Sequence, residues 1–519
     1  MKHDCLRNVV IVGGGTAGWM TAAALAKFLH PQQYQITLVE SDAIGTVGVG
    51  EATVPHIRYF NDVLGIDENE FMKKTNATYK LGIEFSNWGK LGDSYIHPFG
   101  VYGLPHNDIS FHHYWLRLHQ QGDAGSIGDY SVGVVAAAAE KFAYPSSDSG
   151  SLFSKYGYAF HLDATLYAGF LREYSTARGV KRIEGKITNV CQRADDEFIE
   201  SVQLVSGEII AGDLFIDCSG FRGLLISDTL KTEFEDWSHW LPCDRAIAVP
   251  SSSTTAPLPY TKAIARTAGW QWRIPLQNRV GNGQVYSSSY ISDDEVANNL
   301  LSSLDGEPLA NLNYLRFKAG RRVKSWNKNC VSIGLSSGFL EPLESTSIYL
   351  IQVAIMKLVE FFPYVGMEAA NCDEFNRELA NEYERIRDFL ILHYHATQRD
   401  DSAFWNYCRT MEIPVSLATK INLFREQGQV ERYRRGMFLE PSWVAVYMGQ
   451  GVIPNSYHPL VDALDSTQLQ QRLRSIRESI VSGVRAMPNH VDSIKRYCHG
   501  DRAEKSWPPA AMSLYGVFS

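Results

Sequence analysis

The sequence has little of what marks a membrane, secreted or nucleic-acid-binding protein. None of its 519 residues lie in an uninterrupted apolar stretch long enough to span a bilayer, and the first residues lack the pattern of a secretory signal. The formal net charge of -8 is small for this length and argues against nucleic acid or an anionic membrane surface as a partner. We therefore expect a cytoplasmic protein that binds neither.

Cysteine is also scarce, and its spacing forms no pattern. The 8 cysteines include no C-x-x-C pair and are scattered along the chain, at Cys5, Cys191, Cys218, Cys243, Cys330, Cys372, Cys408 and Cys498. This distribution is typical of reduced thiols in the cytosol and argues against a disulfide framework or a zinc site. We expect no metal ion.

The chain opens with a β-α-β pattern that is typical of dinucleotide binding. Residues 9–12 predict a buried strand, residues 16–29 a helix, and residues 35–40 a second strand that ends in Glu40. The turn after the first strand has the spacing G-x-G-x-x-G, with its glycines at Gly13, Gly15 and Gly18. Such a turn lets the backbone approach a pyrophosphate, the helix N-terminus stabilises that anion, and Glu40 can bond the ribose hydroxyls. The turn alone leaves NAD and FAD open.

Two later segments favour FAD. Residues 211–220 predict a buried strand that ends in Ser-Gly, similar to a strand of FAD-containing hydroxylases, and residues 330–338 predict another strand and turn that return to the cofactor. The other glycine cluster, residues 281–283, is followed by residues 284–290, in which polar and apolar side chains alternate as in a β-strand. Because no second nucleotide-binding unit is expected, reduced flavin has to come from another protein.

Two charged residues stand in or beside apolar segments. Lys80 lies within residues 75–88, where a lysine is unusual unless it is paired or functional, although a surface lysine with a buried stem also fits. Glu344 precedes a predicted helix, where a carboxylate also stabilises the helix start. From the sequence alone, Trp270 and Trp272 are as consistent with an aromatic pair in the hydrophobic core as with a functional role.

The run Trp270-x-Trp272-x-Ile274-Pro275, together with the glycine turn, resembles the flavin-dependent halogenases, of which the tryptophan halogenases are the best known. The resemblance covers most of the chain and includes residues 48–55, which are similar to a strap over the flavin. It implies an α/β, FAD-dependent monooxygenase-like fold with a Rossmann-type nucleotide-binding module. We expect one composite unit over residues 1–519, with an FAD-binding module from residues 1–100, 180–225 and 325–350 and a mostly helical part from residues 351–519.

The resemblance also implies roles for individual residues. Lys80 matches the essential lysine of the family, which either hydrogen-bonds hypohalous acid or captures the halogen as a haloamine. Glu344 matches a glutamate that holds this lysine and accepts the proton lost from the aromatic ring. Thr346 and Ser347 match the halide-binding positions, although the family usually has glycine in place of Ser347.

Substrate and cofactor positions follow in the same way. His97 and Phe99 match a histidine and a phenylalanine that sandwich indole in tryptophan halogenases. The residues expected at FAD are Gly13, Gly14, Gly15, Thr16, Ala17, Gly18, Glu40, Ala43, Gly50, Ile187, Leu335 and Ile348.

The reaction implied is halogenation of an electron-rich aromatic compound with chloride or bromide. Reduced FAD, delivered by a separate NAD(P)H-dependent flavin reductase, forms a C4a-hydroperoxide with oxygen. Halide attacks it, and the hypohalous acid passes through the protein to Lys80. An aromatic hydroxylase that transfers OH directly is the alternative, and a non-catalytic flavoprotein is a weaker one. The oligomeric state stays open, with a homodimer among the options.

The C-terminal region departs from the tryptophan halogenases. The tyrosine-rich lid and the Phe-Trp pair that grip the amino acid there are not recognisable, and residues 442–451 stand in their place. The pair Phe404-Trp405 lies elsewhere in the chain. Indole, an indole derivative or a larger aromatic compound is therefore as plausible a substrate as free tryptophan.

Overall fold

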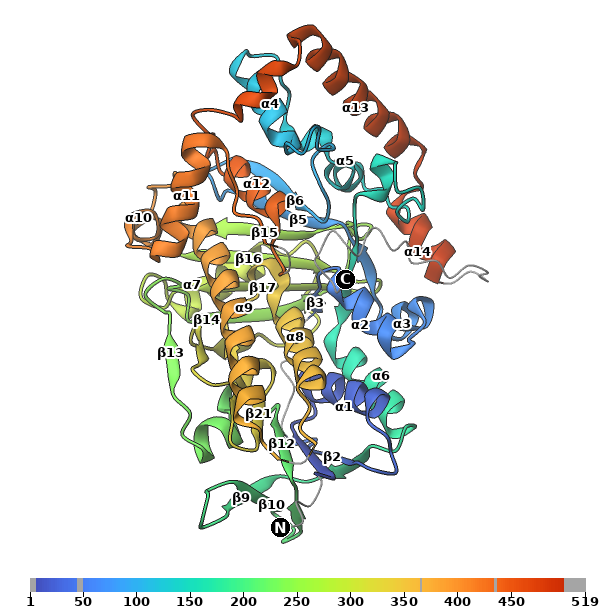
Figure 1. The fold of residues 1–519 in the computed structure, drawn as a ribbon, viewed down its shortest axis with the longest axis vertical. Helices are drawn as coiled ribbons and strands as arrows, with labels where there is room; N and C mark the ends of the chain where they lie inside the picture. The colour runs from blue at the N-terminus through green and yellow to red at the C-terminus, as the bar shows by residue number, and fades with distance from the viewer. Residues whose placement is uncertain (1–5, 44–49, 365, 434–435, 499–519) are drawn as a thin grey trace.

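A parallel sheet at the lower end of the molecule in Figure 1 contains the predicted nucleotide-binding strands. The computed structural model describes residues 6–43, 50–364, 366–433 and 436–498, so Gly48 and Val49 of the predicted strap lie outside the described residues. The strands of this sheet, in spatial order, are β20 (Trp326–Asn327), β21 (Cys330–Ser332), β12 (Leu214–Asp217), β1 (Asn8–Val12), β2 (Gln35–Glu40) and β8 (Lys181–Glu184). The last five run parallel, so the carboxyl ends of β1, β2 and β12 meet at one edge.

Side chains of β1 alternate between two hydrophobic cores. Val9 and Ile11 face the main core, which also receives the fully buried alanines 22–24 of α1 (Thr16–Phe28). Val10 and Val12 face a smaller core. That core is closed by a three-stranded sheet of β9 (Ile187–Gln192), β10 (Ile199–Leu204) and β11 (Ile209–Ala211). Both faces of the sheet are thus covered, as a buried parallel sheet requires.

A larger, mostly antiparallel sheet crosses the middle of the molecule (Figure 1). Its strands, in spatial order, are β18 (Asn313–Arg316), β14 (Arg245–Ser251), β17 (Val280–Tyr286), β16 (Gly269–Pro275), β15 (Thr261–Arg266), β5 (Gly82–Ser86) and β6 (Ser94–Pro98). Two further three-stranded sheets are formed by β3 (Gly50–Ala52), β7 (Ala159–Asp163) and β4 (Thr78–Lys80), and by β13 (Phe234–Asp236), β19 (Gly320–Arg322) and β22 (Gly338–Phe339).

The strand predicted at residues 284–290 begins earlier than expected. The structure places β17 at Val280–Tyr286, so the glycine cluster lies inside the strand rather than before it. Gly283 has a packing reason to be there, because a Cβ at this position would lie 2.1 Å from Trp272 Cζ2. Gly283 therefore permits close packing against an aromatic ring, which periodicity does not reveal.

Helices dominate the chain after residue 345, as predicted. α8 (Thr346–Glu360) and the long α9 (Ala369–His395) lie side by side (Figure 1). They are followed by α10 (Ala403–Thr410), α11 (Val415–Gln427), α12 (Glu440–Gly449), α13 (Ser466–Ala486) and α14 (His490–Cys498). The earlier helices are α2 (His56–Leu64), α3 (Glu68–Lys74), α4 (Phe111–Gln120), α5 (Val132–Ala138), α6 (Ala164–Thr176) and α7 (Asp293–Ser302). The α/β class with a helical C-terminal part is confirmed.

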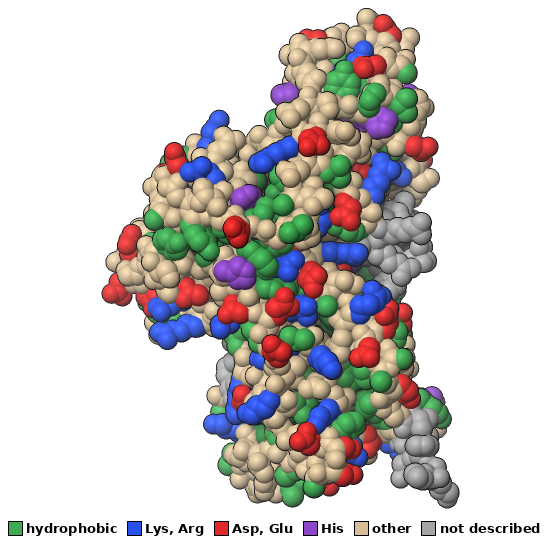
Figure 2. All heavy atoms as spheres, turned by 60° about the vertical axis from the view of Figure 1, so that its left-hand side comes forward, with side chains coloured by type: hydrophobic (Ala, Val, Ile, Leu, Met, Phe, Trp, Pro, Cys, Tyr) green, Lys and Arg blue, Asp and Glu red, His purple; other side chains and the backbone are tan. Residues whose placement is uncertain are grey.

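The distribution of charged side chains on the surface agrees with the modest net charge of the chain. On the face shown in Figure 2, side chains of both signs are interspersed, and hydrophobic side chains lie among them in small groups. Within the part of the chain that the structure describes, no helix is both long and apolar enough to cross a bilayer.

Candidate active site

A cavity of about 790 Å³ runs from the glycine turn to the start of α8. Its volume lies in the range of cofactor pockets. A Cβ on Gly14 would lie 1.4 Å from Glu40 Oε2, whereas a Cβ on Gly15 would meet no atom within 4 Å. Gly15 is also the N-cap of α1, and the first turn of that helix has no acidic residue. The turn therefore presents bare backbone N–H groups to an anion, which fits the pyrophosphate of FAD.

Most of the residues expected at the cofactor line this cavity: Gly13, Gly14, Gly15, Thr16, Ala17, Glu40, Ile187, Leu335 and Ile348. Gly18, Ala43 and Gly50 do not line it. Gly18 instead packs against the turn, because a Cβ there would lie 1.9 Å from Gly13 O. The Glu40 carboxylate is held in place by Trp19 Nε1, which donates at 3.2 Å, and by Arg182.

The other end of the cavity is formed by the turn before α8. Glu344, Ser345, Thr346 and Ser347 all line it. Glu344 and Ser345 have left-handed backbone conformations, with φ of 64° and 60°. Such conformations cost about 1–3 kcal/mol each outside glycine and cluster at functional sites. Because α8 begins at Thr346 without a side-chain cap, its first N–H groups are available to an anion at the predicted halide position.

Lys80, the last residue of β4, is fully buried. Its Nζ donates to Thr53 O and to Ser345 Oγ, each at 2.9 Å, and lies 5.0 Å from the centroid of the Phe99 ring. Burial lowers the pKa of Lys80 to about 7, although the Glu344 carboxylate opposes this shift. Since Ser345 lines the cavity, a single hydroxyl separates Lys80 from the space beside the halide position.

Two histidines hold the Glu344 carboxylate. His97 Nδ1 lies 2.8 and 3.0 Å from its two oxygens, and His393 Nε2 lies 2.9 Å from Oε1. Burial alone would raise the pKa of Glu344, but the charge and hydrogen bonds of His97 and His393 outweigh it and lower the pKa to about 2. The predicted contact between Glu344 and Lys80 is thus not a direct hydrogen bond, because Lys80 bonds the neighbouring Ser345.

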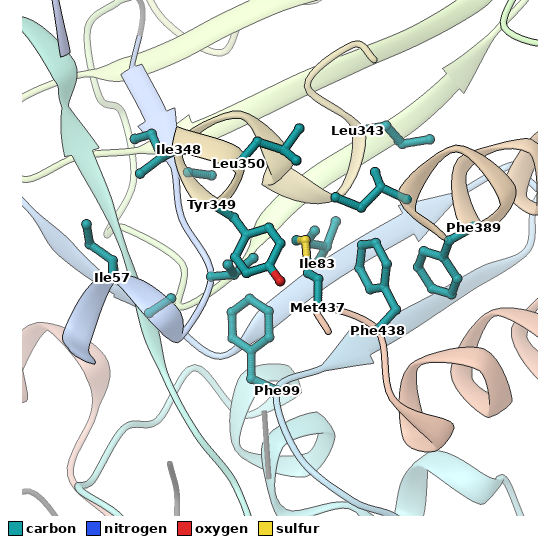
Figure 3. Packing of buried hydrophobic residues seen from close by; sticks show 14 of the residues in the cluster. Ile57, Ile83, Phe99, Leu343, Ile348, Tyr349, Leu350, Phe389, Met437 and Phe438 are labelled. Carbon is teal, nitrogen blue, oxygen red and sulfur yellow. The ribbon is translucent and has the colours of Figure 1, made fainter. Parts of the chain in front are cut away.

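Apolar side chains converge beside these charged groups. Figure 3 shows Phe99, Tyr349, Met437 and Phe438 within one group of packed, buried hydrophobic side chains. The Phe438 ring stacks on Phe389, with 3.8 Å between centroids, and its centroid lies 6.3 Å from that of His97. Neither His97 nor Phe99 lines the cofactor cavity, and both side chains are buried, so their predicted role at the substrate stays a prediction.

The two tryptophans of the halogenase-like run lie on β16, and both line the cofactor cavity. Trp270 Nε1 donates to Glu341 Oε2 at 3.2 Å, and Tyr394 OH donates to the same oxygen at 3.0 Å. Burial raises the pKa of Glu341 to about 8. Trp272 Nε1 is buried, with no hydrogen-bond partner among the described residues. Neither indole touches Lys80 through a hydrogen bond that the structure describes.

Sequence analysis missed three of these contacts. His393 lies on α9, far from Glu344 along the chain, and its one signal was a histidine beside the apolar run of residues 389–392. Ser345 is a small polar residue beside Glu344, and its sequence context does not distinguish it from the serine and threonine residues that follow. Thr53 contributes a backbone oxygen, which leaves no signal in the sequence.

Comparisons with known proteins identify the family of the chain. Residues 8–466 match the family described as tryptophan halogenase. The chain is 37% identical over 491 residues to a tryptophan 6-halogenase of Streptomyces albogriseolus, across 88% of this chain and 91% of that protein. A solved flavin-dependent halogenase from Xanthomonas campestris has a TM-score of 0.92 at 48% identity, with 96% of this chain and 100% of that chain covered. Another, from Brevundimonas sp. BAL3, has a TM-score of 0.92 at 47% identity, with 95% and 99% covered. The chain belongs to the tryptophan halogenase family and is a flavin-dependent halogenase, which uses FAD and a halide ion.

Proposed function

We propose that this halogenase acts on indole or a simple indole derivative and that Lys80 delivers the halogen. The observation that carries the proposal is the place of Lys80, which is fully buried, one hydroxyl from the cofactor cavity and beside an aromatic ring. A hydroxylase that transfers OH directly from the flavin has no use for a lysine here. A non-catalytic flavoprotein has no use for the lysine or for the ionised Glu344 close to it.

Each residue at the α8 end has a task in this proposal. Bound reduced FAD and oxygen supply the oxidant that turns halide into hypohalous acid. The first N–H groups of α8, at Thr346 and Ser347, hold the halide. Lys80, its Nζ fixed by Ser345, receives the halogen and positions it against the substrate, and Glu344 accepts the proton that the ring loses. The protein confines the reactive halogen, which would otherwise oxidise anything nearby.

The substrate side supports an indole rather than an amino acid. The ring of Phe438 lies 6.3 Å from that of His97, and the Phe99 ring lies 5.0 Å from Lys80 Nζ, so these rings near the lysine offer no partner for an amino or carboxylate group beyond the imidazole already paired with Glu344. Phe404 and Trp405 do not line the cofactor cavity and pack against Tyr394, so this pair has no part in the proposed substrate site. Without a lid that pairs with amino and carboxylate groups, recognition depends on aromatic stacking, worth about 0.5–1.5 kcal/mol per pair beyond burial.

A flavin-dependent halogenase of this family needs a separate flavin reductase and a small aromatic substrate. We place the enzyme and its NAD(P)H-dependent reductase in the cytoplasm. The cysteines within the described residues are free thiols, which suits a reducing compartment.

The test is a coupled assay with purified protein, a flavin reductase, NADH, FAD and indole, in bromide, in chloride and without halide. Mass spectrometry should show a halogenated indole whose mass follows the halide supplied. A hydroxylated product that is independent of halide would instead identify the enzyme as a hydroxylase. The Lys80→Met variant should yield hypohalous acid, detected with a scavenger, but no halogenated indole.

A further inference from the structure

A row of buried indoles leads away from the cofactor cavity. Trp270, on β16, lines the cavity, and its ring centroid lies 6.4 Å from that of Trp88, which follows β5. The Trp88 centroid lies 5.6 Å from that of Trp405 on α10. These three side chains, the indole row, are each at most 2% exposed. The row thus connects the cavity with α10, at the left edge of the molecule in Figure 1.

The indole row ends near an exposed tyrosine. The Phe404 ring contacts both Trp405 and Tyr290, with 5.1 Å to the centroid of the first and 5.6 Å to that of the second. Tyr290 is 38% exposed, so its side chain is open to water. Since a phenylalanine ring is hard to oxidise, an electron passes from Tyr290 to Trp405 in one step across it.

The hydrogen bonds of the two inner indoles suit electron transfer without loss of a proton. Trp88 Nε1 donates to Ala263 O at 3.0 Å, and Trp405 Nε1 donates to Arg266 O at 2.7 Å. A backbone carbonyl accepts a hydrogen bond but is a very weak base. An oxidised indole in either position therefore keeps its N–H proton, and only an electron moves along the row.

Charged or polar groups beside the row do not oppose a positive indole. The guanidinium carbon of Arg399 lies 4.6 Å from the Trp405 centroid, but Asp401 accepts two hydrogen bonds of 2.8 Å from this side chain and offsets its charge. At the cavity, Trp270 Nε1 donates to Glu341 Oε2 at 3.2 Å. An oxygen acceptor at an indole N–H attracts positive charge on the ring and so favours loss of an electron.

Indoles and phenols are among the most easily oxidised side chains, and closely spaced rings exchange electrons rapidly because electron tunnelling slows steeply with distance. We propose that the indole row carries electrons from the exposed Tyr290 to the cofactor cavity, where they remove a stray oxidant. This protective activity goes beyond halogenation of a substrate. It rests on the FAD site and does not depend on the role proposed for Lys80.

Electrons and protons balance in the protective reaction. The oxidant is a halogen-centred radical, which gains one electron from Trp270 and becomes a halide ion. Each oxidised indole then takes an electron from the next, and Tyr290 gives the last one and loses its phenol proton to water. A small thiol at the surface returns a hydrogen atom to Tyr290, and two of the resulting thiyl radicals join as a disulfide. The net reaction converts one radical and one thiol into a halide ion, a proton and half of a disulfide.

Light allows a direct test, because excited oxidised flavin withdraws an electron from a nearby indole. The full chain with oxidised FAD bound is excited by a short blue pulse, and transient absorption follows oxidised tryptophan and tyrosine. In the wild type, the signal of oxidised tryptophan should give way to a longer-lived signal of oxidised tyrosine. The decay of the tyrosine signal should accelerate when glutathione is added.

Trp88→Phe is the informative variant, because an aromatic ring remains in place but is hard to oxidise. The electron should then return to Trp270, and the tyrosine signal should be lost. Trp326→Phe is the matched control. Trp326 is also fully buried and donates to a backbone oxygen, that of Lys328, but its ring contacts only Phe375 among the rings of the described residues. A tyrosine signal that survives in Trp88→Phe, or that is lost equally in the control, would overturn the inference.

A second variant keeps the test decisive if Trp88→Phe does not fold. Tyr290→Phe removes one hydroxyl from a partly exposed side chain. Oxidised tryptophan should then persist until the electron returns, and glutathione should have no effect on its decay. An unchanged tyrosine signal in Tyr290→Phe would refute the inference. These signals do not depend on a halogenated product, so a failure of the halogenation proposal would be seen separately in the coupled assay.

Discussion

Replacing Lys80 by methionine should abolish halogenation and, at pH 7, make the fold more stable. Methionine fills the space of the lysine stem without the cavity that alanine would leave, so the change is confined to Nζ. Loss of the group that positions the halogen should lower the halogenation rate by more than about 100-fold. Binding of FAD should persist, because Lys80 does not line the cofactor cavity.

The gain in stability follows from the pKa of Lys80. Folding lowers this pKa from 10.5 to about 7, which corresponds to about 5 kcal/mol. Between these pH values the unfolded chain binds a proton that the folded chain lacks, so the free energy of unfolding rises with pH. The full penalty is present below pH 7 and disappears above pH 10.5. Removing Nζ leaves Thr53 O without its donor, at a cost of about 1–3 kcal/mol. The variant should therefore gain about 2–4 kcal/mol at pH 7 and lose that gain toward pH 10.

Denaturant unfolding at several pH values between 7 and 10, combined with the coupled halogenation assay, measures both effects. The control is Lys74→Met, since Lys74 is about half exposed and pairs with Glu173 at the surface. Its unfolding free energy and activity should stay close to wild type. If Lys80→Met is less stable than wild type at pH 7, burial of Lys80 does not destabilise the fold, and folding does not lower its pKa. If it halogenates at a rate near wild type, Lys80 does not deliver the halogen.

The other predictions concern the proton, the reductant and the substrate. Glu344→Gln should slow halogenation by about 100-fold while hypohalous acid still forms, as measured with a scavenger, and an unchanged rate would make Glu344 a structural carboxylate. The purified protein alone should not oxidise NADH in a spectrophotometric assay, and rapid reduction of its bound flavin by NADH would contradict this. In a competition followed by mass spectrometry, indole should be halogenated at least as well as tryptophan, at its most nucleophilic ring carbon. A strong preference for tryptophan with substitution at one benzo-ring carbon would reveal a lid that the sequence hides.

The cofactor end of the site was predictable because its signals are local. A glycine turn between a strand and a helix, and an acid at the end of the next strand, fix which backbone atoms meet a pyrophosphate. The structure places Gly14, Gly15 and Glu40 at the cavity as that pattern requires. The burial of Lys80 was predictable only with the resemblance, because its segment alone also fitted a surface lysine with a buried stem.

The charge balance around Glu344 was not predictable from local signals. It depends on β6, the turn before α8 and α9, which are distant in sequence and meet only through tertiary packing. The left-handed conformations of Glu344 and Ser345 are likewise invisible to periodicity, because neither residue type favours them. The start of β17 was not predictable for a similar reason, since the role of Gly283 is set by the Trp272 ring on a neighbouring strand.

The strained turn connects these observations. Two consecutive left-handed residues, at about 1–3 kcal/mol each, persist only where the surroundings hold them. Glu344 is held by His97 and His393, and Ser345 by Lys80. Because of this turn, α8 begins at the cavity, where its first N–H groups suit a halide. Lys80 lies on the other side of Ser345 and bonds its hydroxyl. One local distortion thus places the proposed halide site and the lysine on either side of a single residue. A shift in any of the three side chains that hold the turn would disturb both sites together.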